Sequence, residues 1–235
     1  MCFSIRKTLK LHHAIGDRAS VALALIGLAD IARDQGDGAG VRRYCEPSLS
    51  ILRELGMQWA IGIALNTLAL GAYYESNLTR ALTLSRESVA LFRDLKSDAS
   101  LAEVLITLGK IVWAQGDMTA GSGAMTEALR LAQAVGPRLM VAAALEGFAS
   151  VVVAQGHTEL AVQLLAAASA FRVQMGTPVW PIDQAAVAQT LATARSTLGD
   201  ACAAVWAEAH TRALEPMLST IPSMAAYNVL GDRSA

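Results

Sequence analysis

The sequence predicts an all-α protein in which helical hairpins stack into an α-solenoid, and three observations lead to this fold class. A turn-forming position recurs every 40 residues, at Gly16, Gly56, Lys96, Gly136 and Gly176. Two apolar columns precede it with the same period: Leu11, Ile51, Leu91, Leu131 and Phe171, then Ile15, Leu55, Leu95, Val135 and Met175. The composition is 54% hydrophobic but only 5% aromatic, which favours closely packed helices rich in Ala and Leu. Repeats of this length cannot bury their apolar faces alone, so they stack.

The segment after each turn position carries a second apolar stripe. Its columns are Leu25, Leu65, Leu105 and Leu145; Leu28, Leu68, Leu108 and Phe148; Ala29, Ala69, Gly109 and Ala149; and Ala32, Ala72, Val112 and Val152. Within one copy the spacing is i, i+3, i+4, i+7, which is one face of an α-helix. A column of small residues, at Thr8, Ser48, Ser88, Ala128 and Ala168, keeps the same period. The small positions predict where a partner helix approaches closely.

Short turns separate the stripes. They read Gln35-Gly36-Asp37, Glu75-Ser76-Asn77, Gln115-Gly116-Asp117 and Gln155-Gly156-His157. Glycine suits the left-handed position that ends a helix, and Asp or Asn can cap the next one. We therefore predict helices over 2–15, 18–35, 38–55, 58–75, 78–95, 98–115, 118–135, 138–155 and 158–175.

The period breaks after Gly176, at the extended segment Thr177-Pro178-Val179-Trp180-Pro181. Pro181 can occupy the first position of a helix that runs to Leu198, and Gly199-Asp200 then precedes a last helix to about Leu214. We expect a repeat array over 1–176, a continuous pair of capping helices over 177–214, and an irregular tail over 215–235.

Composition argues against several function classes. The formal net charge is −1, and the charged residues are interspersed, so we expect no direct nucleic-acid binding. Cys2, Cys45 and Cys202 are far apart and form no C-x-x-C, which favours buried free thiols in a reducing compartment and a cytoplasmic location. No secretory signal is visible at the N-terminus. The uncharged stretch 55–74 is better explained by the repeat, whose helix break falls at Gly56, than by a membrane span.

Several segments resemble tetratricopeptide repeats of the longer, forty-residue kind. The matching stretches include Ala64-Leu65-Asn66-Thr67-Leu68-Ala69, Leu91-Phe92-Arg93-Asp94-Leu95 and Ala114-Gln115-Gly116-Asp117. The resemblance covers about residues 8 to 176. It implies a right-handed solenoid in which the first helix of each hairpin lines a concave groove.

A narrower resemblance lies towards the C-terminus. The stretches 159–168, 175–178, 194–200 and 206–208 are similar to the C-terminal helical region of large bacterial ATP-binding regulators, often of the LuxR type. The resemblance implies that the chain is the sensor or arm of such a regulator, separated from its ATPase. The sequence has no G-x-x-x-x-G-K-[ST] motif and no convincing helix-turn-helix, so we expect neither nucleotide hydrolysis nor DNA binding by this chain.

No catalytic or metal-ligating constellation stands out, and we expect a protein that is not an enzyme and needs no cofactor. His12 and His13 are adjacent, so on a helix they point about 100° apart. Gly36-Asp37-Gly38-Ala39-Gly40 follows a helical stripe, whereas a dinucleotide loop follows a strand. A turn followed by the start of a helix explains this glycine-rich segment better than a phosphate-binding loop does.

The functional hypothesis comes from columns whose chemistry changes between copies on the first helix of each hairpin. They are Ile26, Asn66, Ile106 and Glu146; Asp30, Leu70, Lys110 and Ser150; and Arg33, Tyr73, Trp113 and Val153. Varied side chains on a repeated frame suit a specific protein or peptide site. The predicted partner-binding groove comprises Asp30, Arg33, Asn66, Leu70, Tyr73, Tyr74, Lys110, Trp113 and Glu146.

Two alternatives stay open at this stage. Tyr73, Tyr74 and Trp113 could instead pack between hairpins. The chain could also be a receptor for a small-molecule effector enclosed near Trp180 and Trp206. Otherwise the expected partner is a protein or peptide segment, which could be the ATPase domain of the same regulator.

Overall fold

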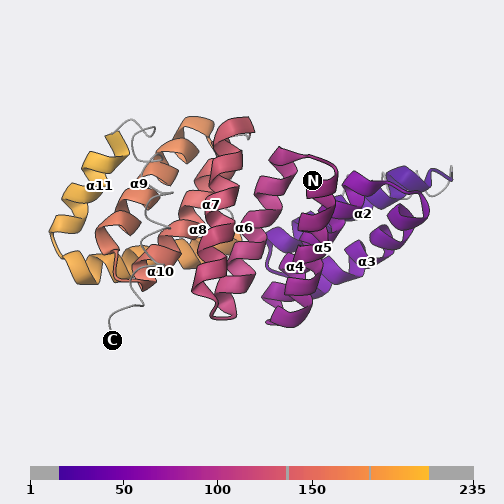
Figure 1. Ribbon diagram of the computed structural model, residues 1–235, viewed down its shortest axis with the longest axis horizontal. Coiled ribbons are helices and arrows are strands. Elements are labelled where there is room, and N and C mark those ends of the chain that lie inside the picture. Colours follow the sequence, from indigo (N-terminus) through magenta and orange to yellow (C-terminus); the bar gives the residue numbers. More distant parts are fainter. Residues whose placement is uncertain (1–15, 136–137, 180, 212–235) are drawn as a thin grey trace. The chain divides into compact units, whose positions relative to one another are not determined.

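The computed structural model of the chain describes residues 16–135, 138–179 and 181–211. In these ranges the chain forms α-helices and contains no strand (Figure 1). The helices are α2 (Arg18–Asp34), α3 (Gly38–Glu54), α4 (Gln58–Tyr74), α5 (Leu78–Asp94), α6 (Asp98–Ala114), α7 (Met118–Val135), α8 (Arg138–Ala154), α9 (Thr158–Met175), α10 (Pro181–Leu198) and α11 (Ala201–Thr211). From α2 to α9 each helix begins 20 residues after the one before it.

The described turns from α2 to α9 contain a left-handed residue that is followed by the N-cap residue of the next helix. Gly36, Gly116 and Gly156 have φ values of 70°, 90° and 85°, and Ser76 and Lys96 take the same conformation at 58° and 51°. The backbone N–H that follows returns to the helix just ended, as in Asp37 N to Ala32 O at 2.9 Å. Four of the residues that follow such a turn position cap the next helix with their side chains, whereas Met57 and His157 make no side-chain capping bond. The capping bonds join Asp17 to Ser20 N, Asp37 to Gly40 N, Asn77 to Arg80 N and Asp117 to Ala120 N.

The chain divides into two compact units, Met1–Ile111 and Val112–Ala235, with the boundary inside α6. In the first unit α2 packs on α3, α3 on α4 and α4 on α5, and α2 also touches α4. A core cluster joins α2, α3 and α4 through residues such as Ala22, Leu52 and Leu65, which are fully buried. In this unit α2 and α4 therefore neighbour each other, and α3 and α5 pack against them.

Small residues bring the helices of one hairpin together. The Ser48 hydroxyl of α3 donates to Ala22 O of α2 at 2.7 Å, and the Ser88 hydroxyl of α5 donates to Gly62 O of α4 at 2.8 Å. A Cβ added at Gly62 would lie 2.6 Å from the Phe92 ring. The small-residue column predicted from the sequence thus lies at a close helix contact, where the serines also satisfy their hydroxyls.

In the second unit α7 packs on α8 and α8 on α9. The helices after the linker continue this order, because α10 contacts α8 and α9 while α11 contacts α9. The Ser150 and Thr190 hydroxyls join α8 to α10 at 3.1 Å. A smaller core of Val162, Ala194 and Cys202 lies between α9, α10 and α11.

The helices predicted between residues 18 and 198 are confirmed with bounds that differ by about one residue. The expected helix over 2–15, the turn at Gly136, Trp180 and the tail over 215–235 lie outside the described residues. The glycines of α7 do not interrupt it, since Met118–Val135 is one helix. Across the described ranges, no helix combines the length and apolar character that crossing a bilayer needs.

Candidate functional site

The candidate site lies on one side of the even-numbered helices of the first unit. On α4 the positions are spaced three or four residues apart, so they share one side of the helix. This even-helix face is formed by Leu23 and Asp30 of α2, by Trp59, Ile63, Thr67, Leu70 and Tyr74 of α4, and by Glu103 and Lys110 of α6. Trp59 is 55% exposed and Leu23 is 45% exposed, which is unusual for large apolar side chains in the described part of the chain.

A partly buried polar cluster occupies the middle of this face. Asp30 accepts from the Arg33 guanidinium at 2.9 Å and from the Thr67 hydroxyl at 3.3 Å. Arg33 also binds Asp34 at 3.0 Å. We call Asp30, Arg33, Asp34, Thr67 and Glu103 the Asp30 cluster; it draws side chains from α2, α4 and α6.

Burial shifts the protonation of this cluster. Burial raises the pKa of Asp30 above its ordinary 3.8, although Arg33 and the Thr67 hydrogen bond act to lower it. Burial likewise raises the pKa of Glu103 above 4.5, against the lowering effect of Arg33. Burial lowers the pKa of Arg33, but Asp30 and Asp34 outweigh it and the net shift is upward. A single guanidinium therefore does not compensate for the burial of these carboxylates.

The thiol beneath the cluster is inert. Cys45 of α3 is fully buried, and its Sγ donates to Ala64 O at 3.2 Å. Burial, with Asp30 and Glu46 nearby, raises the pKa of the Cys45 thiol to about 12. Cys202 is also buried and free, so the expectation of buried free thiols is confirmed at both cysteines that the structure describes. Cys45 therefore does not supply a thiolate nucleophile near neutral pH.

Seven of the predicted groove residues belong to the first unit. Asp30 and Arg33 meet in the cluster, as just described, while Leu70, Tyr73, Tyr74 and Lys110 are partly buried. The rings of Tyr73 and Tyr74 lie edge to face with centroids 6.0 Å apart. Asn66 is instead buried, and its Oδ1 has no hydrogen-bond partner among the described residues. Asn66 is therefore not accessible to a partner that binds at the surface.

Trp113 and Glu146 belong to the second unit, and Glu146 needs correction. Its carboxylate is 4% exposed and accepts from Nε and Nη2 of Arg172 on α9 at 2.6 and 2.8 Å. Arg172 Nη1 donates to Pro178 O at 2.8 Å, so the pair also holds the linker that leads to α10. Glu146 is thus a packing residue between α8 and α9 and is inaccessible to a peptide. Trp113 is partly buried on α6.

The comparison of repeat columns within the chain did not identify Thr67, Glu103 and Trp59 as site residues. Thr67 meets Asp30 across 37 residues and Trp59 Nε1 reaches Ser100 Oγ, at 3.2 Å, across 41 residues, whereas the columns compared positions 40 apart. Contacts between stacked helices therefore do not follow one column. A search for polar residues three positions off the repeat period would have linked Thr67 to Asp30.

Trp206, one of the two residues expected around a small-molecule effector, lies among packed side chains of the second unit. Trp206 packs with Val205, Leu191 and Leu198 against the core of α9, α10 and α11, and its ring stacks on His210 with centroids 6.4 Å apart. Trp180 lies outside the described residues. Trp206 is consequently engaged in packing within the second unit.

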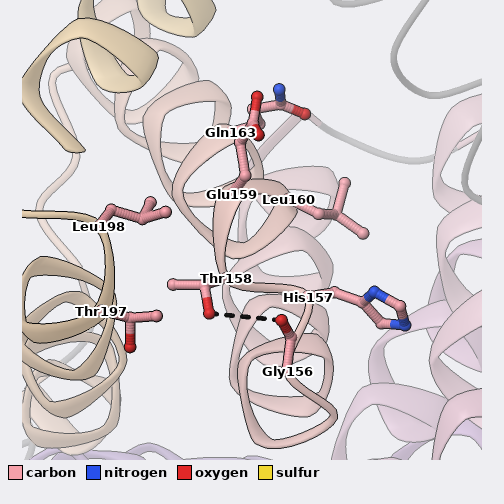
Figure 2. Close-up of a pocket in the computed structure, with 8 residues that line it drawn as sticks. All are labelled: Gly156, His157, Thr158, Glu159, Leu160, Gln163, Thr197 and Leu198. Atoms are coloured by element: carbon pink, nitrogen blue, oxygen red, sulfur yellow. Dashed lines mark hydrogen bonds between the residues drawn. The ribbon is translucent and has the colours of Figure 1, made fainter. Parts of the chain in front are cut away.

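A cavity of about 620 Å³ opens nearby, at the start of α9, and it is lined by Gly156, His157, Thr158, Glu159, Leu160, Gln163, Thr197 and Leu198. Figure 2 shows Thr197 and Leu198 on one side of the α9 start and the His157 ring on the other. The Thr158 hydroxyl bonds its own turn, to Gly156 O at 3.4 Å. The polar groups do not converge on one point, as a specific ligand site requires. Within the described residues, no three His, Cys, Asp or Glu side chains are grouped to hold a metal ion.

Comparisons with known proteins bear on the fold alone. No protein-family model and no curated protein matches the sequence. Among solved structures, the crystal structure of BtubC (BKLC) from P. vanneervenii is similar, with a TM-score of 0.62 and 14% sequence identity. The match covers 100% of this chain and 92% of that one. An all-helical fold consistent with a helical repeat is what this similarity supports.

Proposed function

We propose that the chain is a protein- or peptide-binding scaffold that uses the even-helix face of its first unit. The observation that carries the proposal is the makeup of that face. Exposed Trp59 and Leu23 lie on the same helices as a cluster of partly buried charges, although large apolar side chains elsewhere in the first unit are mostly buried. Hot spots of protein interfaces are enriched in aromatic anchors, and charged pairs that become desolvated there can contribute strongly to specificity.

The architecture that we propose for this scaffold is a right-handed α-solenoid of tetratricopeptide-like hairpins, each about 40 residues long. Helices that start 20 residues apart from α2 to α9 support it. In this arrangement α10 and α11 cap the C-terminal end. Contacts of α10 with α8, and of α11 with α9, support the cap because they cover the last hairpin.

We further propose that the scaffold is the cytoplasmic sensor or interaction portion of an ATPase-linked transcriptional regulator. The similarity of stretches 159–168 and 194–200 to the helical region of such regulators supports this assignment. The binding partner is then a protein segment, with the ATPase domain of the same regulator as a candidate. No covalent chemistry is involved.

A selection from a displayed library of random peptides tests the binding function. Peptides that bind the wild-type chain are synthesised, and their affinities are measured by fluorescence polarisation. We expect the double substitution Trp59→Ala and Leu70→Ala to weaken binding, because it removes apolar contact area from the face. The matched control is Leu55→Ala with Leu95→Ala, which removes exposed apolar side chains at helix ends. Equal affinity for both double variants, each still folded, would refute the assignment of the face.

A further inference from the structure

We propose that the even-helix face recognises a peptide that presents a basic side chain, lysine or arginine, to the Asp30 cluster and an apolar side chain to Trp59. The inference rests on the proposed function and specifies the partner's chemistry. It follows from the charge, the exposure and the spacing of the residues on this face.

Charge is the first argument. Three carboxylates, on Asp30, Asp34 and Glu103, face one guanidinium, on Arg33. Asp30 and Glu103 both lie near Arg33, yet burial still outweighs its effect on their protonation. The cluster therefore lacks positive charge, and a second cation would be stabilised there while an anionic side chain would be repelled.

The contacts of Arg33 show that this cluster accommodates a basic side chain. The Arg33 guanidinium binds Asp30 Oδ1 at 2.9 Å and Asp34 Oδ1 at 3.0 Å. The side chain of Asp30 is 35% exposed, so solvent and a ligand can reach it from outside. The Thr67 hydroxyl bonds the same oxygen, Oδ1, from the α4 side. Asp30 is thus fixed in position by two helices, and it needs no rearrangement to receive an incoming donor.

Spacing along α4 defines the apolar part of the motif. Thr67 and Trp59 are both on α4, so at 1.5 Å per residue they are about 12 Å apart along the helix axis. An extended peptide advances about 3.3 Å per residue. Its apolar residue should therefore lie about three to four residues from the basic one. The Trp59 indole is held by its bond to Ser100 on α6, which leaves the ring 55% exposed.

The test uses the peptide library selected on the full chain. We expect selected peptides to share one Lys or Arg, with an apolar residue three or four positions away, as the spacing requires. For a synthesised binder, Asp30→Asn with Glu103→Gln should weaken binding roughly tenfold or more, because a charge-assisted hydrogen bond is lost. Changing the basic residue of the peptide to Gln should weaken binding to the wild type similarly, with little further effect on the double variant.

The control is Glu54→Gln with Glu87→Gln, which neutralises two carboxylates in exposed ion pairs with Arg18 and Arg53. Its affinity should match the wild type. Selected peptides that lose affinity with Trp59→Ala but show no basic residue, or bind the cluster variant normally, would overturn this inference and leave the proposed function standing. A selection that yields no peptide sensitive to the face would overturn both. Thermal unfolding establishes that each variant is folded.

Discussion

At the scale of the residue, the buried ion pair of Glu146 and Arg172 makes stability sensitive to single substitutions. Both side chains are 4% exposed, and two hydrogen bonds join them. A buried ion pair contributes little beyond a hydrophobic replacement, but removing one partner leaves a charge without compensation. The pair therefore specifies how α8, α9 and the linker fit together, and breaking it by a single substitution is costly.

We expect Arg172→Met to lower the free energy of unfolding by about 3–5 kcal/mol. The double substitution Glu146→Leu with Arg172→Met should lose much less, because no charge stays buried. Urea denaturation measures both. The control Arg53→Met removes an exposed arginine that pairs with Glu87 and should cost at most about 1 kcal/mol. If the double variant is as unstable as the single one, the loss comes from packing and not from the orphaned carboxylate.

Protonation of Glu103 gives a prediction with a definite sign. Because burial raises its pKa, the folded chain holds this proton more tightly than the unfolded chain does. The stabilising contribution is present below the ordinary pKa of 4.5 and is lost as pH rises through the raised value. Glu103→Gln stays neutral, so its melting temperature should exceed that of the wild type by more at neutral pH than near pH 4.5.

Differential scanning calorimetry at the two pH values would measure this difference. Glu87→Gln is the matched control, since its carboxylate is exposed and paired with Arg53. A gap between Glu103→Gln and the wild type that does not change with pH would contradict the prediction. The functional implication is that ionising Glu103 in the cluster costs stability, as groups in binding sites commonly do.

At the scale of the element, the described helix ends use glycine at the left-handed position, except at Ser76 and Lys96. Gly56 ends α3 with φ of 67°, and a Cβ there would meet nothing within 4 Å. Ser76 and Lys96 adopt the same left-handed conformation with a side chain, at φ of 58° and 51°. The left-handed region costs residues other than glycine roughly 1 kcal/mol or more. The turns after α4 and α5 are therefore strained, whereas the described turns that place glycine at this position are relaxed.

We expect Lys96→Gly to raise the free energy of unfolding by about 0.5–1 kcal/mol, since glycine relieves the strain at the end of α5. Gly56→Ala should have the opposite sign and cost roughly 1 kcal/mol. Chemical denaturation of the two variants in parallel provides the measurement. Should Lys96→Gly destabilise the chain, the lysine side chain would have to contribute contacts that outweigh its backbone strain.

At the scale of the whole molecule, most helix contacts join neighbours in the chain. Helix α2 packs on α3, α3 on α4 and α4 on α5, and the same holds from α7 to α9. In such an array the free energy of unfolding is approximately a sum of terms from each repeat and its contacts with its neighbours. A destabilising substitution therefore affects mainly the helices next to it. The two compact units described by the contacts are consistent with that behaviour.

Hydrogen exchange followed by mass spectrometry should reveal this locality. In Arg172→Met, exchange should speed up in α8, α9 and α10, because Arg172 joins the first two helices and the linker before the third. Protection of α2, α3 and α4 should stay close to that of the wild type. A uniform loss of protection along the chain would indicate one cooperative unit instead.

The sequence by itself determined where the helices begin and end. Turn residues act on the backbone next to them, so Gly36 with Asp37, or Gly116 with Asp117, locate a helix end without knowledge of its neighbours. Ser76 and Lys96 are not glycines, yet they also form turns, because the repeat period assigns those positions to turns. Asp30 and Arg33 were also found from sequence, as column positions with changed chemistry.

Only the tertiary structure decided which polar residues meet. Thr67 joins Asp30 across 37 residues, and Arg172 joins Glu146 across 26, so neither pair shares a column of the forty-residue period. Glu146 was wrongly assigned to the groove for this reason. Arg172 replaces buried Leu52 and Phe92 of the earlier copies, a substitution that signals a buried partner without naming it. Side-chain pairing depends on how packed helices are offset, and that offset is a property of the packing and not of any local sequence.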